Sequence, residues 1–249
     1  MKIGVCIPFY NEQKCIAATL EALLAQTDRE FTVFLCDNNS TDESVAIAKA
    51  FIEKHKLDWQ VVPETQKGTG AAADTAMRAA AAVGCSLLAR TDADSLPDEN
   101  WIRAIRAKFT RQPKLSMVSG LSIPIRSEVS FFEFWLLRFA TTVAMIFGLV
   151  RPSNYQRGMR GIYIMTSGNN LAIRAADYLA VGGFPRTRIE DVHEDRALVN
   201  AVRGQGLEVT RFRKMRVAVS ARRVKHWGLM ASIRWYRNQY RPSQNVDIR

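Results

Sequence analysis

Ser86-Leu87-Leu88-Ala89-Arg90-Thr91-Asp92-Ala93-Asp94 is a short, mostly apolar run that ends in two aspartates. Its first six residues predict a buried strand, and Leu96-Pro97-Asp98 predicts a turn into a helix. Two carboxylates therefore follow the end of a strand. Ligands of open α/β sheets bind at the carboxyl ends of the strands, so Asp92 and Asp94 are candidates to hold a divalent cation against a phosphate. Acidic pairs at strand ends also occur as solvated turns or helix caps, so other segments have to support this interpretation.

The alternation of strands and helices around this run predicts the fold class. The expected strands are residues 2–8, 31–36, 57–62 and 86–91, and the expected helices are 16–26, 45–52, 71–83 and 100–111. Such an order predicts an α/β fold with a doubly wound, mostly parallel sheet. The strands lack a polar–apolar alternation, as expected when both faces of a sheet are covered.

Shorter signals add local detail. Pro8 should end the first strand because proline has no backbone N–H. Ser40 and Glu43 have the spacing of a capping box at the start of the second helix. Gly68-Thr69-Gly70 lacks the third glycine of a dinucleotide fingerprint and follows the third strand rather than the first, which argues against dehydrogenase chemistry. Residues 208–219 predict two short strands, after which a basic, aromatic helix is expected.

Residues 131–150 form an apolar run that only Glu133 and Arg138 interrupt. A membrane-spanning helix needs about 20 mostly apolar residues, so the length is borderline and the two charges argue against insertion. We favour an amphipathic helix that lies on a bilayer or covers an acceptor groove, with a core helix and a membrane span as alternatives. The nearby Arg151, Arg157 and Arg160 are compatible with an anionic lipid surface.

A second acidic cluster precedes a helix in the C-terminal half. It consists of Glu190-Asp191 and Glu194-Asp195, and Leu198, Val199 and Val202 mark the helix that follows. Carboxylates in a first helical turn are favoured by the helix dipole in any case. The cluster is therefore either a second set of functional carboxylates or a helix start.

The net charge of +11 is concentrated at the C-terminus. The last 49 residues carry 12 of the 35 Lys and Arg residues but only 2 of the 24 Asp and Glu residues. Such a segment should meet an anionic partner, which can be phosphate, a membrane surface or nucleic acid, unless it is simply a solvated tail.

The cysteines and the N-terminus bear on the cellular compartment. Cys6, Cys15, Cys36 and Cys85 show no Cys-x-x-Cys spacing, and three of them lie in or beside apolar runs. We expect small core residues in a reducing compartment. The chain passes from Met1-Lys2 directly into a strand without a signal or transit pattern, which predicts a cytoplasmic location, with peripheral association at the inner membrane face as the alternative.

Taken together, these segments resemble the GT-A glycosyltransferases of family 2, inverting enzymes that move a sugar from a nucleotide-sugar donor. The motifs that carry the resemblance occur in the family's order over residues 1 to about 225. They are Pro8-Phe9-Tyr10-Asn11-Glu12, Asp37-Asn38-Asn39-Ser40-Thr41-Asp42, Asp92-Ala93-Asp94, Gly182-Gly183-Phe184 and Glu194-Asp195-x-x-Leu198. Each motif alone is weak, but their order and spacing make the assignment specific.

The resemblance implies a nucleoside site at the first two strand ends. Asp37 would accept the ring N–H of a uracil or a similar base. Pro8, Tyr10 and Glu12 would pack on the nucleoside and bond its ribose. The sequence leaves uracil, thymine and guanine open, because each of these bases offers a ring N–H.

The resemblance also implies a phosphate and catalytic site. Asp94 would be the direct ligand of Mg²⁺ or Mn²⁺ on the diphosphate, and Asp92 would lie near the ribose and the metal. Asp195 would be the general base that deprotonates the acceptor hydroxyl. Arg222 and Arg223 are similar to a basic pair whose guanidinium groups can contact the diphosphate.

Three positions stay open or depart from the family pattern. Asp191 is a rival for the base role of Asp195. His226 is either a further metal ligand or a surface histidine beside a tryptophan. Asp74 occupies a helix position where members commonly have Asn.

The resemblance divides the chain into a GT-A domain of residues 1–225 and a basic, aromatic segment of residues 226–249. Within the domain we expect a nucleotide-binding half at 1–123, an apolar insertion at 124–160 and an acceptor-side half at 161–225. The acceptor would be a glycan of the cell envelope or a lipid-linked acceptor.

Two other functions compete with this one. A sugar-phosphate nucleotidyltransferase would need a Gly-rich phosphate loop after the first strand, and residues 8–12 contain no glycine. A nucleic-acid-binding α/β module is suggested by the basic, aromatic C-terminus alone, so we do not expect nucleic acid to be the partner.

Overall fold

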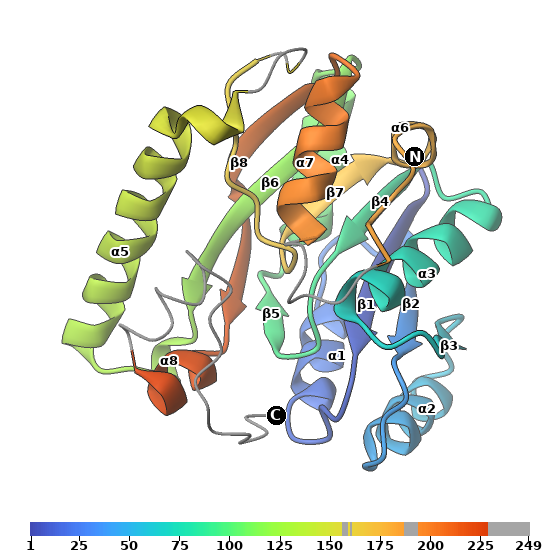
Figure 1. The fold of residues 1–249 in the computed structure, drawn as a ribbon. Coiled ribbons are helices and arrows are strands. Elements are labelled where there is room, and N and C mark those ends of the chain that lie inside the picture. Colours follow the sequence, from blue (N-terminus) through green and yellow to red (C-terminus); the bar gives the residue numbers. More distant parts are fainter. Residues whose placement is uncertain (156–158, 160, 187–193, 229–249) are drawn as a thin grey trace.

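The computed structural model describes residues 1–155, 159, 161–186 and 194–228. Within them, an eight-stranded sheet has the order β3-β2-β1-β4-β7-β6-β8-β5 (Figure 1). The strands are β1 (Ile3–Phe9), β2 (Phe31–Asp37), β3 (Gln60–Pro63), β4 (Leu87–Arg90), β5 (Ser95–Pro97), β6 (Leu115–Pro124), β7 (Leu171–Arg174) and β8 (Glu208–Val219). The helices are α1 (Ile16–Leu24), α2 (Ser44–Lys54), α3 (Thr69–Ala82), α4 (Trp101–Arg111), α5 (Phe131–Val150), α6 (Ala175–Ala180), α7 (Glu194–Gly204) and α8 (Arg222–Trp227), with short 3₁₀ turns η1 (Arg126–Glu128) and η2 (Pro152–Asn154).

The first four strands of this order, β3, β2, β1 and β4, are parallel, as the sequence predicts. Alternate residues of β1 face opposite cores: Val5 packs with the cluster around α1 and α4, and Cys6 packs with the cluster around α3 and α7. Both faces of these strands are therefore covered. Three of the four cysteines, Cys6, Cys36 and Cys85, are buried, in agreement with their expected role as small core residues.

The second half of the sheet is mixed. Strand β7 lies antiparallel between β4 and β6, and β5 pairs antiparallel with β8. The prediction of two short strands at residues 208–219 is wrong, because β8 is one strand parallel to β6. Its pairing shifts between Arg211 and Arg216, an irregularity that leaves the chain extended.

Two local predictions are also wrong. Pro8 lies inside β1, opposite Cys36 of β2. The pairing of β1 with β4 ends at Cys6, so Pro8 is not required to donate a hydrogen bond on that side. The capping box at Ser40 does not form: its hydroxyl accepts from the N–H of Asn11 at 3.0 Å, and Asp42 Oδ1 accepts from the N–H of Ser44 at 3.0 Å instead.

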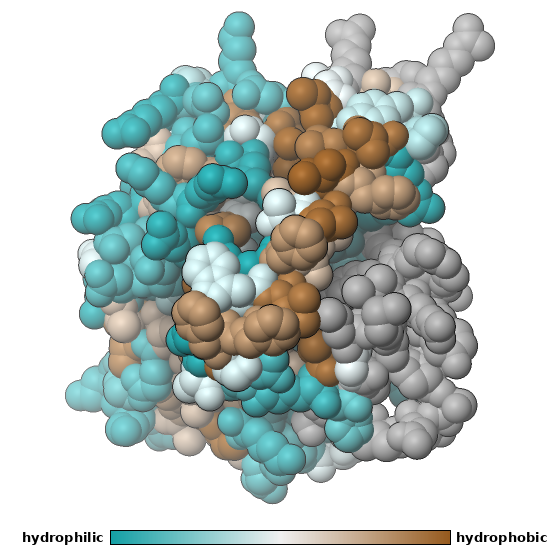
Figure 2. Space-filling model, turned by 90° about the vertical axis from the view of Figure 1, so that its left-hand side faces the viewer, coloured by the Kyte–Doolittle hydropathy of each residue, from teal (hydrophilic) through white to brown (hydrophobic). Residues whose placement is uncertain are grey.

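Helix α5 coincides with the predicted apolar run and lies at one side of the molecule, next to β6 (Figure 1). A capping box of Ser130 and Glu133 starts it. By length and composition it is the one described helix that could cross a membrane, yet only 6% of its apolar window is buried. Figure 2 shows a band of hydrophobic side chains over this face of the molecule. This exposure argues against the core-helix interpretation.

Candidate active site

Asp92 and Asp94 lie in the loop that follows β4, at the carboxyl end of that strand. The buried Ala93 between them is held by the hydroxyl of Thr19, which donates to its carbonyl oxygen at 2.7 Å. The two carboxylates flank this anchored residue and keep 34% and 23% of their side-chain surface exposed. The sequence-predicted position at a strand end is therefore confirmed.

Arg90 is the last residue of β4, and its side chain is 1% exposed. Its Nη2 atom lies 3.3 Å from Asp92 Oδ1 and 3.2 Å from Glu194 Oε1. The guanidinium also lies 4.9 Å from the ring centroid of Phe184, and a Cβ at Gly168 would approach it to 2.9 Å. Burial lowers the pKa of Arg90, but the charges of Asp92 and Glu194 outweigh burial and raise it. One fixed cation thus joins the first acidic cluster to the second.

Asp195 follows Glu194 in the first turn of α7. Its Oδ1 atom accepts a hydrogen bond from the N–H of Arg196 at 2.7 Å. Loss of contact with water, followed by the negative charge of Glu194, raises the pKa of Asp195 to about 7. A carboxylate with a pKa near the operating pH is suited to general base catalysis.

Arg222, the first residue of α8, binds the other aspartate. Its Nη2 atom lies 3.0 Å from Asp94 Oδ2 and 2.5 Å from Glu12 Oε1, and its Nη1 atom donates to Glu12 Oε2 at 2.7 Å. Burial lowers the pKa of Arg222, but the hydrogen bonds to Glu12 and the charge of Asp94 outweigh burial, so the pKa is raised. Residues from the two ends of the described chain therefore meet at Asp94.

The predicted nucleoside residues occupy the neighbouring strand ends. Pro8 is buried within β1, and Tyr10 is half-buried in the loop beyond it. Asp37 ends β2, where its Oδ1 atom accepts from the N–H of Ser40 at 3.0 Å. Among the described residues, the Asp37 carboxylate forms no hydrogen bond or ion pair with the Asp92–Asp94 loop. Its role at the base stays a prediction.

The carboxylates fit a divalent cation only in part. Asp92 and Asp94 offer the hard oxygen ligands that Mg²⁺ and Mn²⁺ prefer. Among the described residues, however, no group of three or more His, Cys, Asp and Glu side chains could hold a metal ion. Mg²⁺ commonly binds one or two carboxylates together with substrate phosphates and water, so this donor set fits a cation that arrives with a diphosphate.

Several sequence predictions fall outside the described residues or gain no support. The rival Asp191, the arginines 157 and 160, and the aromatic residues beyond 228 lie outside the described residues. His226 is exposed on α8 and belongs to no group of three or more metal-binding side chains among the described residues.

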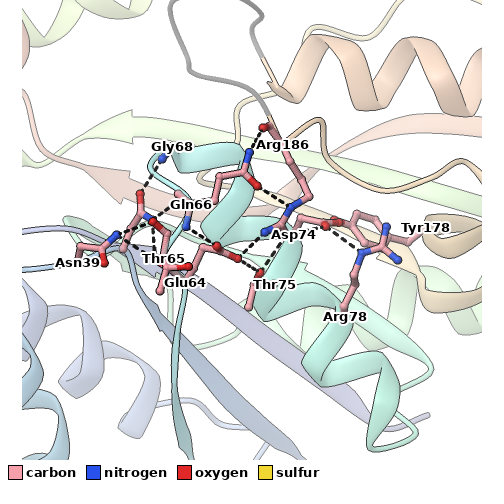
Figure 3. A network of polar contacts seen from close by, with 11 residues as sticks. Asn39, Glu64, Thr65, Gln66, Gly68, Asp74, Thr75, Arg78, Tyr178 and Arg186 are labelled. Atoms are coloured by element: carbon pink, nitrogen blue, oxygen red, sulfur yellow. Dashed lines mark hydrogen bonds and ion pairs between the residues drawn. The ribbon is translucent and has the colours of Figure 1, made fainter.

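A polar network beside the site was not predicted (Figure 3). Arg186 lies 2.6 Å from Glu64 Oε2 and 3.2 Å from Asp74 Oδ2. The buried Asp74 also accepts from the hydroxyl of Tyr178 at 2.8 Å and from Arg78 Nε at 2.9 Å. Three donors thus surround the carboxylate of Asp74. The network ties the end of β3 to the segment that leads toward α7.

Sequence reasoning also missed Arg90 and Glu128. The signal for Arg90 was its charge at the end of an otherwise apolar strand, directly before the aspartates. Glu128, in η1, accepts from the hydroxyl of Ser220 at 2.9 Å and from the N–H of Ala221 at 2.7 Å. Only the fold brings these residues together, since they are separated by more than 90 positions.

A family model and a curated relative match parts of the chain. The family model named Glycosyl transferase family 2 matches residues 4–177. A chondroitin synthase of Escherichia coli is 33% identical over 76 residues, which are 30% of this chain and 11% of that protein.

Solved structures share the fold. A mannosyltransferase of Pyrobaculum calidifontis, in complex with GDP-Man and Mn²⁺, has a TM-score of 0.62 at 22% identity over 88% of this chain and 56% of that chain. Glucosyl-3-phosphoglycerate synthase of Mycobacterium tuberculosis, in complex with Mn²⁺, UDP and phosphoglyceric acid, has a TM-score of 0.58 at 15% identity over 97% of this chain and 80% of that chain. The expected GT-A type of fold is confirmed. The chain spans only part of the length of the chondroitin synthase and of the mannosyltransferase.

Proposed function

Because the chain belongs to glycosyl transferase family 2, we propose that it moves a sugar from a nucleoside-diphosphate sugar to an acceptor hydroxyl, with inversion at the anomeric carbon. The observation that carries this proposal is the position of Arg90. It contacts Asp92 and Glu194 with one nitrogen and so joins two carboxylate clusters that lie 102 residues apart in the sequence. Residues that bind the donor and the residue that acts as the base must lie close together to take part in one reaction.

Asp195 is proposed as the general base. It would take the proton of the acceptor hydroxyl as that oxygen attacks the anomeric carbon, while the bond from this carbon to the diphosphate breaks and the diphosphate leaves with the bonding electrons. The raised pKa of Asp195 makes its carboxylate a better proton acceptor than an ordinary aspartate. Glu194, paired with Arg90, would hold the start of α7 in place.

Asp94, with Asp92 beside it, is proposed to hold Mg²⁺ or Mn²⁺ against the diphosphate. When bound, the cation would neutralise the charge that develops on the leaving diphosphate. The solved mannosyltransferase with GDP-Man and Mn²⁺ supports this part of the proposal by likeness of fold. Pro8, Tyr10, Glu12 and Asp37 stay the candidates for the nucleoside.

The proposal is tested with donors and metal. A thermal-shift screen of UDP-, GDP- and dTDP-sugars with Mn²⁺ should raise the melting temperature for one donor, because a ligand of the native state stabilises in proportion to the logarithm of its saturation. The stabilisation should disappear with EDTA and in Asp94→Ala. A chain that none of the three donors stabilises, with or without Mn²⁺, would contradict the proposal.

The acceptor side of the proposal concerns α5. Its exposed apolar residues recur at spacings of three and four, which places them on one stripe: Phe132, Trp135, Phe139, Val143, Ile146 and Val150. Arg126 and Arg138 stack near the aromatic rings of Phe134 and Trp135 at 5.0 and 5.6 Å. An apolar stripe with cations beside it fits the headgroup region of an anionic bilayer. We propose peripheral membrane contact and a lipid-linked acceptor or a cell-envelope glycan, in a cytoplasmic protein.

Vesicle sedimentation tests the membrane contact. The triple variant Phe132→Ser, Trp135→Ser, Phe139→Ser should lose binding to phosphatidylglycerol vesicles. A matched control changes two exposed apolar residues elsewhere, Val83→Ser and Leu179→Ser, and should bind like the unaltered protein. Equal binding of all three proteins would remove α5 from the membrane role.

A further inference from the structure

The guanidinium of Arg222 occupies the coordination side of Asp94. It lies 3.0 Å from Asp94 Oδ2 and contacts both carboxylate oxygens of Glu12. Asp94 is the proposed metal ligand, and Glu12 is the proposed partner of the ribose. One side chain thus satisfies two acidic groups that the donor complex would also use.

The backbone that carries Arg222 is anchored from another element. The carboxylate of Glu128 accepts from the N–H of Ala221 at 2.7 Å and from the hydroxyl of Ser220 at 2.9 Å. The long side chain of Arg222 keeps 25% of its surface exposed. A fixed backbone with a partly exposed, flexible side chain allows the guanidinium to change partners without moving α8.

The guanidinium of Arg222 and a divalent cation cannot both bind Asp94 favourably, because both are positively charged. A divalent cation on Asp94 would lie close to the positive charge of Arg222, and like charges at such distances repel. The described residues offer no third carboxylate, cysteine or histidine to strengthen a cation site against this repulsion. A diphosphate would relieve the conflict, because arginine forms strong paired hydrogen bonds with phosphate oxygens.

We propose that Arg222 competes with the divalent cation for Asp94 in the free protein and moves to the diphosphate when the cation–nucleotide complex binds. This inference rests on the proposed function and adds to it a binding order. The free cation binds weakly, and cation and nucleotide enter together. Arg222 therefore has two sets of partners in one reaction cycle.

Calorimetry on the full chain tests the exchange. Mn²⁺ alone is titrated into the unaltered protein, Arg222→Met and Arg216→Met. Arg216 is an exposed arginine of β8 and controls for the loss of one positive charge. Arg222→Met should bind Mn²⁺ alone about tenfold more tightly, which corresponds to ~1.4 kcal/mol. Arg216→Met should match the unaltered protein.

Titrations of UDP, GDP and dTDP at saturating Mn²⁺ should show the opposite change in affinity. Arg222→Met should bind the recognised nucleotide about tenfold more weakly. Arg222→Lys keeps one charge without the paired donors, so its gain in Mn²⁺ affinity should be smaller than that of the Met variant. It also serves if the Met variant does not fold.

The outcomes separate this inference from the proposed function. Mn²⁺-dependent nucleotide binding by the unaltered protein, with no gain in Mn²⁺ affinity in Arg222→Met or Arg222→Lys, overturns the exchange alone. Absence of Mn²⁺-dependent binding of UDP, GDP and dTDP in the unaltered protein overturns the exchange and counts against the proposed donor site as well.

Discussion

Asp92 and Asp94 lie two residues apart, and each pairs with an arginine, but the two pairs differ in their surroundings. Arg90, the partner of Asp92, is 1% exposed and belongs to the sheet. Arg222, the partner of Asp94, is 25% exposed and comes from a six-residue helix near the end of the described chain. The buried Arg90 also contacts Glu194, whereas the partly exposed Arg222 also contacts Glu12.

The difference suggests that the two aspartates of Asp92-Ala93-Asp94 have different roles. The guanidinium of Arg90, beside Asp92, packs against the ring of Phe184 and against Gly168, where a side chain would clash with it. It can hold the acidic start of α7 in place. The Asp94 side has a partner that can leave. We infer that the first side sets the geometry of the base and the second side exchanges ligands.

The largest expected effect is at the base. Asp195→Asn should lower the transfer rate by roughly 10²–10⁴-fold, the usual contribution of a general base. Donor affinity should stay nearly unchanged, since Asp195 belongs to the fixed side. Initial rates and donor titrations measure both quantities, with Glu208→Gln on the exposed start of β8 as the charge-matched control. Unaltered turnover in Asp195→Asn would remove this residue from the base role.

Removal of the buried arginine should cost more stability than removal of an exposed one. Arg90→Leu leaves Asp92 and Glu194 without their shared cation, so we expect a loss of about 3–5 kcal/mol in the free energy of unfolding. Arg78, 47% exposed, pairs with Asp74, which keeps two other donors. Arg78→Leu should therefore cost at most about 1 kcal/mol. Denaturant titration measures the free energy of unfolding of both variants. Equal losses would contradict the claim that the buried arginine contributes more stability than the exposed one.

Replacement of Asp94, whose arginine partner can leave, should weaken metal-dependent donor binding. Substitution of a residue that only hydrogen-bonds a metal ligand typically weakens metal affinity by about 10–100-fold. Removal of the proposed ligand itself, in Asp94→Ala, should therefore weaken Mn²⁺-dependent donor binding by at least that much. Its stability without metal should change less than that of Arg90→Leu, because the Asp94 pair is partly exposed. Calorimetry with Mn²⁺ and UDP or GDP measures the affinity. Unchanged metal dependence would contradict the ligand assignment.

The last expected effect concerns the pH dependence of stability. The pKa of Asp195 rises from 3.8 to about 7 on folding, so the native state holds this proton more tightly than the unfolded chain does. The stabilisation is complete below pH 3.8 and is lost as the pH rises toward about 7. Relative to Asp195→Asn, the unaltered protein should thus lose stability over this window, while transfer activity rises. A constant difference across the window would show that folding does not raise the pKa of Asp195.

Much of the fold was predictable because its signals are local. The strands follow from short apolar runs and α5 from one long apolar run, and the family motifs place Asp92 and Asp195 at their elements. Proline at position 8 misled the prediction, because its tolerance depends on where the pairing with β4 ends. That information lies in another segment of the chain.

The parts that could not be predicted are pairings between distant residues. The antiparallel position of β7 between β4 and β6 depends on the whole sheet. The glutamates that pair with Arg90, Arg186 and Arg222 lie 104, 122 and 210 residues away from them. A sequence shows that such arginines exist, but only the fold shows which carboxylates they neutralise.

The most direct test of the shared site is a crystal structure of the chain with Mn²⁺ and the recognised nucleoside diphosphate, with Mn²⁺ located by anomalous scattering. We predict Mn²⁺ on the Asp94 carboxylate, Arg222 on the diphosphate, and Asp195 facing the same ligand from α7. Mn²⁺ and nucleotide bound away from Asp94, with Arg222 still paired to it, would contradict the proposed site.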